Sequence, residues 1–236
     1  MPQLIAMIIV VVGAMIYMFQ TFGGTGDKIE GIAQKTSVIT EINNIKTGVK
    51  LAARSEEIST EVDNTDPLNP KTTAANLKGL ADLKYFAEQI NDQISNNNVT
   101  TAPDTAYEKE NAYNAISFGG TDTQVGGMFI SLVADKKGAI PGIFVSFNFE
   151  GSTLKESGGF LESQIATDLK DVAYIDRHAV EAKSGAFTAG TGRTDTNDKS
   201  EISKRTPENT AASTGSESDG KFIIYFKDFG SNEVVK

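Results

Sequence analysis

The first charged side chain of this sequence is Asp27, and an uninterrupted apolar run extends from Leu4 to Phe19 before it. At about 1.5 Å of rise per residue, a helix from Met1 to Phe22 would reach about 33 Å, which is close to the thickness of the hydrocarbon core of a bilayer. The segment is therefore long enough to span a membrane. Any fold of the chain has to keep these side chains out of water.

The flanks of the apolar run indicate how it is processed. No Lys or Arg precedes it, and residues 22–26 contain no small-residue cleavage pattern, so it does not have the features of a removable secretory signal. An ordinary signal anchor would carry Lys or Arg on its inner flank. We therefore expect Met1 to be the first residue of a mature chain whose basic leader was removed upstream. A plain signal anchor that begins at its own start codon stays open as an alternative.

The N-terminal run, which reads LIAMIIVVVG from Leu4 to Gly13 and continues into a longer amphipathic segment, resembles the type IV pilin superfamily of pilins, pseudopilins and their relatives. The resemblance covers about the first quarter of the chain and consists of hydrophobic pattern more than of signature residues. One position departs from the family. The fifth mature residue is usually a glutamate that helps to register the incoming subunit, and here it is Ile5.

The resemblance implies a set of properties for the N-terminal segment. A dedicated peptidase would remove the leader and Met1 would be N-methylated. The segment would lie in the inner membrane before assembly, and the pilus assembly machinery with its ATPase would then pack it with copies of itself into a helical homopolymer. The side chains expected to pack in the filament core are Leu4, Ile5, Met7, Ile8, Val11, Val12, Met15, Ile16 and Phe19.

Three glycines, Gly23, Gly24 and Gly26, follow the apolar run. Each would destabilise a continuous helix by about 1 kcal/mol relative to alanine, so the sequence predicts a helix break there.

A second helical pattern follows the glycines and extends to about Ser55. Apolar side chains recur at spacings of three, four and seven, which predicts one buried face made by Ile32, Ile39, Ile42, Ile45, Val49 and Ala52. The other faces hold the charged residues Lys28, Glu30, Lys35, Glu41, Lys46 and Lys50. Residues 1–55 are therefore predicted to form a long hydrophobic and amphipathic α-helix, a pilin-like spine. A single-pass anchor followed by a juxtamembrane helix has the same periodicity and stays open.

Composition limits what the rest of the chain does. The charge balance is acidic, with 22 Lys plus Arg against 31 Asp plus Glu. Such a chain offers no basic stripe, so no nucleic-acid partner is predicted. The sequence contains no cysteine, which excludes disulfides and thiolate metal ligands. Residues 56–236 are sufficient for one globular domain with its own core.

This domain is predicted to be an α+β head with an antiparallel sheet and additional helices. Apolar periodicity predicts helices over residues 73–95 and 160–180. Two runs rich in Ile, Val and Phe, residues 128–134 and 142–149, predict strands joined as a hairpin, and residues 222–226 predict a final strand.

The remaining segments are predicted to be loops. A polar loop follows the first of these helices and leads into a weaker segment that ends at Tyr113. Between residues 186 and 220 the sequence is rich in Thr, Ser, Gly, Asp, Asn and Lys, which predicts a long polar surface loop. Asn98 begins an Asn-x-Thr triplet and is the predicted acceptor for N-glycosylation.

Residue types that perform catalysis are present but not in a recognisable pattern. The single histidine, His178, falls next to Asp176 on the predicted helix 160–180. No Gly-x-Ser-x-Gly elbow, phosphate-binding loop or His-Glu-x-x-His pair occurs. Oxygen ligands cluster in residues 195–201 without the calcium-loop pattern. The sequence therefore predicts no enzyme and no catalytic, cofactor-binding or metal-binding residue.

Together these patterns favour a structural subunit of an extracellular type IV pilus-like filament on the cell surface. Two alternatives stay open. One is a signal-anchored periplasmic or surface binding domain, and the other is a low-copy minor pilin or pseudopilin of a secretion system.

Overall fold

The computed structural model of the chain describes residues 31–60, 75–100, 107–194, 200–212 and 215–236. The chain divides into two compact units, Met1–Val38 and Ile39–Lys236. Within the described residues no helix combines the length and the apolar character needed to cross a membrane. The predicted membrane segment lies outside them.

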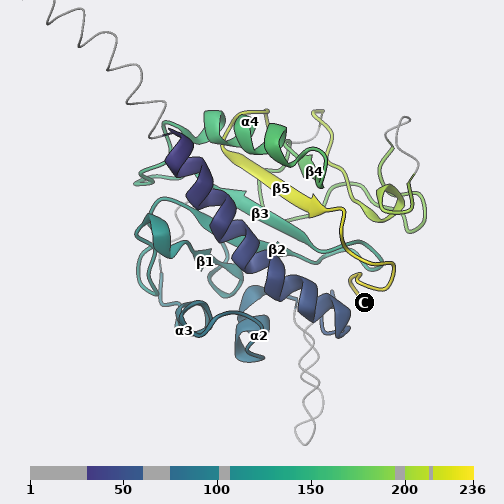
Figure 1. Ribbon diagram of the computed structural model, residues 1–236, viewed down its shortest axis with the longest axis horizontal. Coiled ribbons are helices and arrows are strands. Elements are labelled where there is room, and N and C mark those ends of the chain that lie inside the picture. The colour runs from purple at the N-terminus through teal and green to yellow at the C-terminus, as the bar shows by residue number, and fades with distance from the viewer. Residues whose placement is uncertain (1–30, 61–74, 101–106, 195–199, 213–214) are drawn as a thin grey trace, which may run out of the picture. The chain divides into compact units, whose positions relative to one another are not determined.

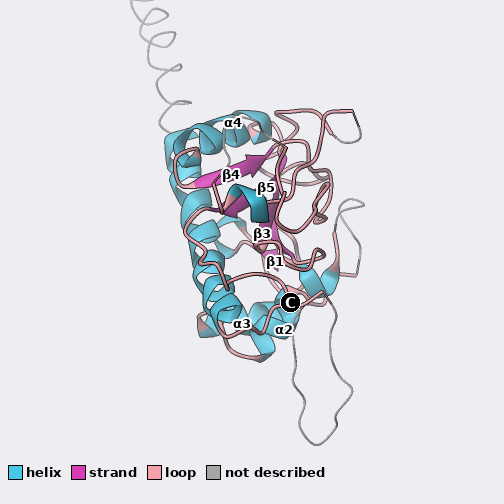
Figure 2. Cartoon of the chain, turned by 90° about the vertical axis from the view of Figure 1, so that its right-hand side faces the viewer, coloured by secondary structure: helices cyan, strands magenta, loops and turns pink. Residues whose placement is uncertain are grey.

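A five-stranded antiparallel sheet forms the centre of the second unit (Figure 1). Its strands are β1 (Tyr113–Asn114), β2 (Phe129–Val133), β3 (Gly142–Ser146), β4 (Ala173–Asp176) and β5 (Lys221–Phe226). Their spatial order is β1-β2-β3-β5-β4. Every residue of β2 and β3 is buried, because a helix covers one face of the sheet and loops lie on the other (Figure 2).

The three predicted strands are confirmed. β2 and β3 form an antiparallel hairpin in which Phe129 pairs with Ser146 and Val133 pairs with Gly142. The turn between them passes through Gly138, whose φ of 81° is a left-handed conformation that glycine adopts without strain. The predicted final strand is β5, which lies between β3 and the edge strand β4.

The amphipathic pattern before Ser55 is a helix over residues 31–54, as predicted. From Ile39 onward it belongs to the second unit and crosses the sheet in front of β2, β3 and β5 (Figure 1). Its buried apolar residues include four of the predicted face, namely Ile42, Ile45, Val49 and Ala52. The prediction is wrong at its first position, since Ile32 is 62 % exposed, and Ile39 is half-buried.

The prediction of one helix over residues 73–95 is wrong. The segment forms two helices, α2 (Leu77–Asp82) and α3 (Glu88–Ser95). The backbone turns at Lys84, whose φ of 63° ends α2. The Asn91 side chain then accepts a hydrogen bond from Phe86 N at 3.2 Å and donates one to Phe86 O at 2.7 Å. These groups take the place of the helical hydrogen bonds, although the apolar spacing continues across the break.

The prediction of a helix over residues 160–180 is also wrong in its second half. The helix is α4 (Gly158–Leu169), and Leu161 and Ile165 are its buried apolar side chains. The chain then forms β4, which pairs with β5 through Tyr174 opposite Tyr225 and Ile175 opposite Ile224. The pairing with β5 decides the structure here, since apolar spacing over so short a run fits helix and strand equally. His178 lies after β4 and not on a helix.

The polar segment 186–220 packs on the sheet through its described residues. Its regular structure there consists of the short 3₁₀ helix Ser203–Arg205 and an isolated bridge between Ala186 and Glu208. Asn209 donates hydrogen bonds from its backbone N and its Nδ2 to the buried carboxylate of Asp176, at 2.8 and 2.9 Å. These loops lie on the side of the sheet opposite the helix that includes residues 39–54 (Figure 2).

The close approach of the N-terminal helix to the loop between α2 and α3 gives a test of its packing. A Cβ added at Gly48 would lie 2.7 Å from Tyr85 O and closer still to the Phe86 ring. Gly48→Ala should therefore lower the free energy of unfolding by about 1–2 kcal/mol, because overpacking outweighs the usual gain from replacing a helical glycine. Urea unfolding measures the effect. The exposed neighbour gives the control, since Thr47→Ala should be neutral or slightly stabilising, and stabilisation by Gly48→Ala would contradict the packing described here.

Candidate functional site

The residues predicted to act in processing and filament packing lie outside the described part of the chain. These are Met1, the apolar positions from Leu4 to Phe19, and the glycines at 23, 24 and 26. Asn98 is described, and its side chain is exposed, as is that of Thr100 in the same triplet, while Val99 between them is buried. The predicted glycosylation acceptor is therefore accessible.

The single histidine lies beside the ion pair between Arg177 and Glu217. His178 Nδ1 lies 3.3 Å from Gly215 O, and Nε2 lies 3.8 Å from the Glu217 carboxylate. Arg177 contacts the same carboxylate at 3.0 Å. Among the described residues no group of three or more His, Cys, Asp and Glu side chains is placed to hold a metal ion.

The outward face of the N-terminal helix carries a groove of about 390 Å³. We call it the helix groove, and its lining consists of Asn43, Lys46, Thr47, Lys50, Leu51, Arg54 and Asp228. Six of these residues come from the helix at spacings of three and four, which places them on one side of it. Leu51 is 48 % exposed, so this face presents an apolar side chain among polar ones.

The cations of the helix groove are paired with carboxylates near the C-terminus. Lys46 and Lys50 both contact Asp228, with Nζ to Oδ2 distances of 3.0 and 2.8 Å. Lys46 also lies over the Phe226 ring, 4.3 Å from its centroid. Partial burial alone would raise the pKa of Asp228, but the hydrogen bonds from Lys50 and Lys46 outweigh it and lower that pKa. Asp228 therefore stays ionised and holds two helix side chains.

Residues 228–236, which we call the C-terminal strap, run beside the end of the helix. Lys236 N donates to Ile58 O at 2.9 Å, and Thr60 N donates to Lys236 O at 3.3 Å. The buried Glu233 carboxylate accepts hydrogen bonds from Arg54 Nε at 3.0 Å and from Gly230 N at 2.7 Å. The strap thus fixes the helix to the head through side-chain and backbone contacts.

A buried carboxylate joins the middle of the helix to the sheet. Glu41 is only 3 % exposed, and it accepts hydrogen bonds from Tyr113 Oη at 2.7 Å and from Ser117 N at 3.0 Å. The sequence pattern places Glu41 on a charged, solvent-facing side of the helix, and that prediction is wrong. Its partners come from β1 and the turn after it, so nothing in the helical sequence itself indicates the burial.

This contact predicts a loss of stability at alkaline pH. Burial, reinforced by the neighbouring Glu41, raises the pKa of Tyr113 above its ordinary 10.0, and burial raises the pKa of Tyr225 as well. Above pH 10.0 the unfolded chain ionises these phenols while the folded chain keeps them neutral, so stability should fall by about 1.4 kcal/mol per pH unit for each tyrosine. Urea unfolding as a function of pH should show a shallower fall for Tyr113→Phe, and shallower again for Tyr113→Phe with Tyr225→Phe. An unchanged slope in both variants would contradict the burial of the phenols.

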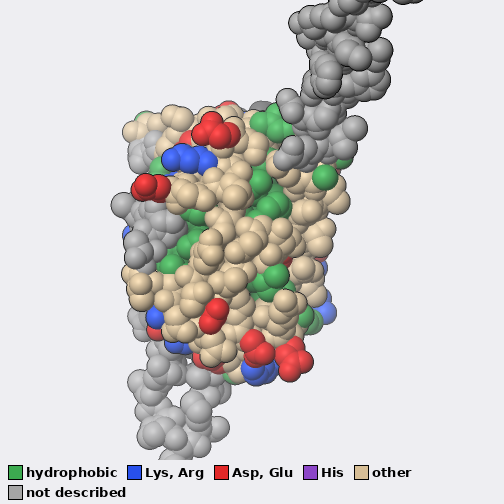
Figure 3. Space-filling view, turned by 90° about the vertical axis from the view of Figure 1, so that its left-hand side faces the viewer, with side chains coloured by type: hydrophobic (Ala, Val, Ile, Leu, Met, Phe, Trp, Pro, Cys, Tyr) green, Lys and Arg blue, Asp and Glu red, His purple; other side chains and the backbone are tan. Residues whose placement is uncertain are grey.

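On the face drawn in Figure 3, acidic and basic side chains lie mainly toward the two ends, and hydrophobic side chains lie between them.

Comparison with known proteins finds no matching family model, no matching curated protein and no matching solved structure. The assignment of a function therefore depends on the sequence pattern and on the geometry described above.

Proposed function

We propose that this chain is a structural, non-enzymatic subunit of an extracellular type IV pilus-like filament, polymerising through its apolar N-terminal segment. One observation carries the proposal. The apolar run from Leu4 to Phe19 precedes an amphipathic helix whose buried face packs on the antiparallel sheet of an α+β head. Such a polymer requires an apolar segment that packs in its core and a helix that joins this segment to a head domain exposed to water.

Assembly would transfer the segment Leu4–Phe19 from the lipid of the inner membrane to the core of a filament made of copies of the chain. Lipid tails are as apolar as these side chains, so the transfer gains little from the hydrophobic effect and depends on packing contacts and on external work. An assembly ATPase would supply that work. With Ile5 in place of a glutamate, Gln3 is the nearby polar side chain that could meet the Met1 amino group.

The fixed junction between helix and head supports this function. A filament transmits tension along its helices, so each head has to stay attached to its own helix. The pairs Lys50–Asp228 and Arg54–Glu233 and the backbone contact between Lys236 and Ile58 make that attachment through the C-terminal strap. The helix groove lies beside these pairs, and its half-exposed Leu51 is available to a neighbouring copy.

Mass spectrometry of the N-terminal peptide tests the proposal. Protein is sheared from the surface of native cells, and the membrane fraction of the same cells serves as the comparison. We expect the sheared material to contain a peptide that begins at an N-methylated Met1. An unprocessed chain found only in the membrane fraction would contradict the proposal and favour the signal-anchored domain. Processed protein at low abundance in sheared filaments would favour a minor pilin or pseudopilin.

A further inference from the structure

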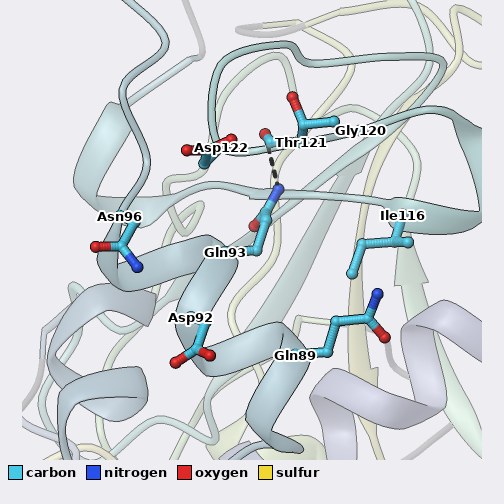
Figure 4. A pocket seen from close by; sticks show the side chains of 8 residues that line it. All are labelled: Gln89, Asp92, Gln93, Asn96, Ile116, Gly120, Thr121 and Asp122. Atoms are coloured by element: carbon cyan, nitrogen blue, oxygen red, sulfur yellow. Dashed lines mark hydrogen bonds between the residues drawn. The ribbon is translucent and has the colours of Figure 1, made fainter.

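A second pocket of about 390 Å³, separate from the helix groove, opens between α3 and the loop that follows β1. We call it the α3 pocket. Four of its residues lie on one face of α3 and at its end, and the others come from residues 116–122 (Figure 4). The lining consists of Gln89, Asp92, Gln93, Asn96, Ile116, Gly120, Thr121 and Asp122. Its volume falls in the range of small-molecule sites, about 300–1,000 Å³.

The floor of the α3 pocket is held by a fixed amide. Gln93 is 8 % exposed, and its Nε2 donates to Asn114 O at 2.9 Å and to Thr121 O at 3.0 Å. Asn114 Nδ2 donates to the same Thr121 oxygen at 2.9 Å. Among the described residues the Oε1 of Gln93 accepts no hydrogen bond although it is buried. These three hydrogen bonds fix the floor before any ligand arrives.

Ile116 is the apolar side chain of the lining, and the other side chains of the lining are polar or charged. Figure 4 shows Ile116 and Gln89 on one side of Gln93, and Asn96 and Asp122 on the other. Side-chain amides both donate and accept hydrogen bonds, and carboxylates accept them. A ligand that fits this arrangement needs hydroxyl groups along one edge and a carbon surface along another.

The charges of the lining limit the class of ligand further. Asp92 and Asp122 are the ionisable residues of the lining, which contains no Lys, Arg or His, so an anion would be repelled while a neutral or cationic ligand would not. Lys84 Nζ lies 4.0 Å from Asp92, and both side chains are mostly solvent-exposed, which weakens their interaction. A wholly apolar ligand would leave the amides without partners at a cost of about 1–3 kcal/mol each.

From this geometry we propose that the α3 pocket binds a neutral sugar residue. Its hydroxyls would donate to Asp122 and to the amide oxygens and accept from the Nδ2 of Asn96, while its C–H face would lie against Ile116. The inference does not depend on filament assembly. A subunit with this pocket could contact glycans whether it is polymerised or anchored, and its failure would leave the proposed function unaffected.

Saturation-transfer NMR on the full chain tests the proposal, in micelles of a detergent whose headgroup is not a sugar. The probes are methyl α-D-mannopyranoside, methyl β-D-galactopyranoside and N-acetyl-D-glucosamine, with glucose 6-phosphate as the anionic comparison. We expect at least one neutral probe to bind saturably and the phosphate to bind more weakly. Absence of binding by all three neutral probes, or equal binding of the phosphate, would overturn the proposal.

Substitutions locate the binding. Asn96→Ala and Asp122→Ala each remove one proposed contact near the rim of the pocket. Each should lower the affinity for the neutral sugar that binds by about tenfold. The control Asn44→Ala removes the same type of side chain from an exposed position on the N-terminal helix and should change the affinity less than twofold. Equal affinity of the control and of both pocket variants would place the bound sugar elsewhere and refute the assignment.

Discussion

Glu162→Ala should lower the free energy of unfolding by about 3–5 kcal/mol, because it removes the buried acceptor of two backbone N–H groups and of the Nε of the partly buried Arg177. The Glu162 side chain is 0 % exposed on α4. It accepts hydrogen bonds from Arg177 Nε at 2.7 Å, from Ser218 N at 2.9 Å and from Gly220 N at 2.9 Å. One carboxylate therefore connects α4, the end of β4 and the segment that enters β5.

The other carboxylate partner of Arg177 provides the matched control. Glu217 contacts Arg177 Nη1 at 3.0 Å, but its side chain is 56 % exposed. Exposed ion pairs contribute about 0–1 kcal/mol, so Glu217→Ala should change stability by no more than that. Urea unfolding of the three proteins, followed by circular dichroism, measures both effects. Similar values for the two variants would show that Glu162 does not hold these segments together.

The confirmed predictions depend on contacts between residues close in sequence, and the failed ones depend on contacts between distant residues. The hairpin of β2 and β3 depends on two adjacent apolar runs and a turn with Gly138, all of which are visible in the local sequence. β4 becomes a strand because β5 is beside it, and Tyr225 lies far along the chain from its partner Tyr174. Periodicity carries no information about such a partner.

Buried polar residues show the same limit. Charged side chains on helices usually face solvent. Glu41 and Glu162 do not, since each has partners from elements distant in sequence, Tyr113 for the first and Ser218 for the second. A buried carboxylate satisfied by backbone N–H groups leaves no local signature, because the donors are present in every residue.

Some features of the candidate site could be predicted from the sequence and others could not. The apolar character of Leu4–Phe19 and the buried face of the amphipathic helix could be predicted from composition and spacing alone. The C-terminal strap could not, because Asp228 and Glu233 contact helix residues almost the whole domain away in sequence. The α3 pocket could not be predicted either, because its lining combines α3 with residues 116–122, which apolar spacing does not bring together.

Substitutions of two aliphatic residues of the same helix should distinguish an effect on the stability of the subunit from an effect on filament assembly. Ile45 is 0 % exposed on the face that packs on the sheet, and Leu51 is 48 % exposed in the helix groove. Ile45→Ala should lower the free energy of unfolding by about 2–5 kcal/mol, as expected for a truncated core side chain. Leu51→Ala should change it by less than about 0.5 kcal/mol, because the side chain is already half in water.

At Leu51 we expect a large effect on filament yield, although the effect on stability is small. If neighbouring copies cover the helix groove, Leu51→Ala removes an apolar contact that is repeated in every subunit, so sheared filaments should become scarce while the folded monomer stays in the membrane. Leu83→Ala is the control, since Leu83 is 37 % exposed between α2 and α3, away from the groove lining. Equal filament yields for Leu51→Ala and Leu83→Ala would show that the groove faces solvent in the polymer. Because both changes leave the core intact, any difference between them reports contacts between subunits.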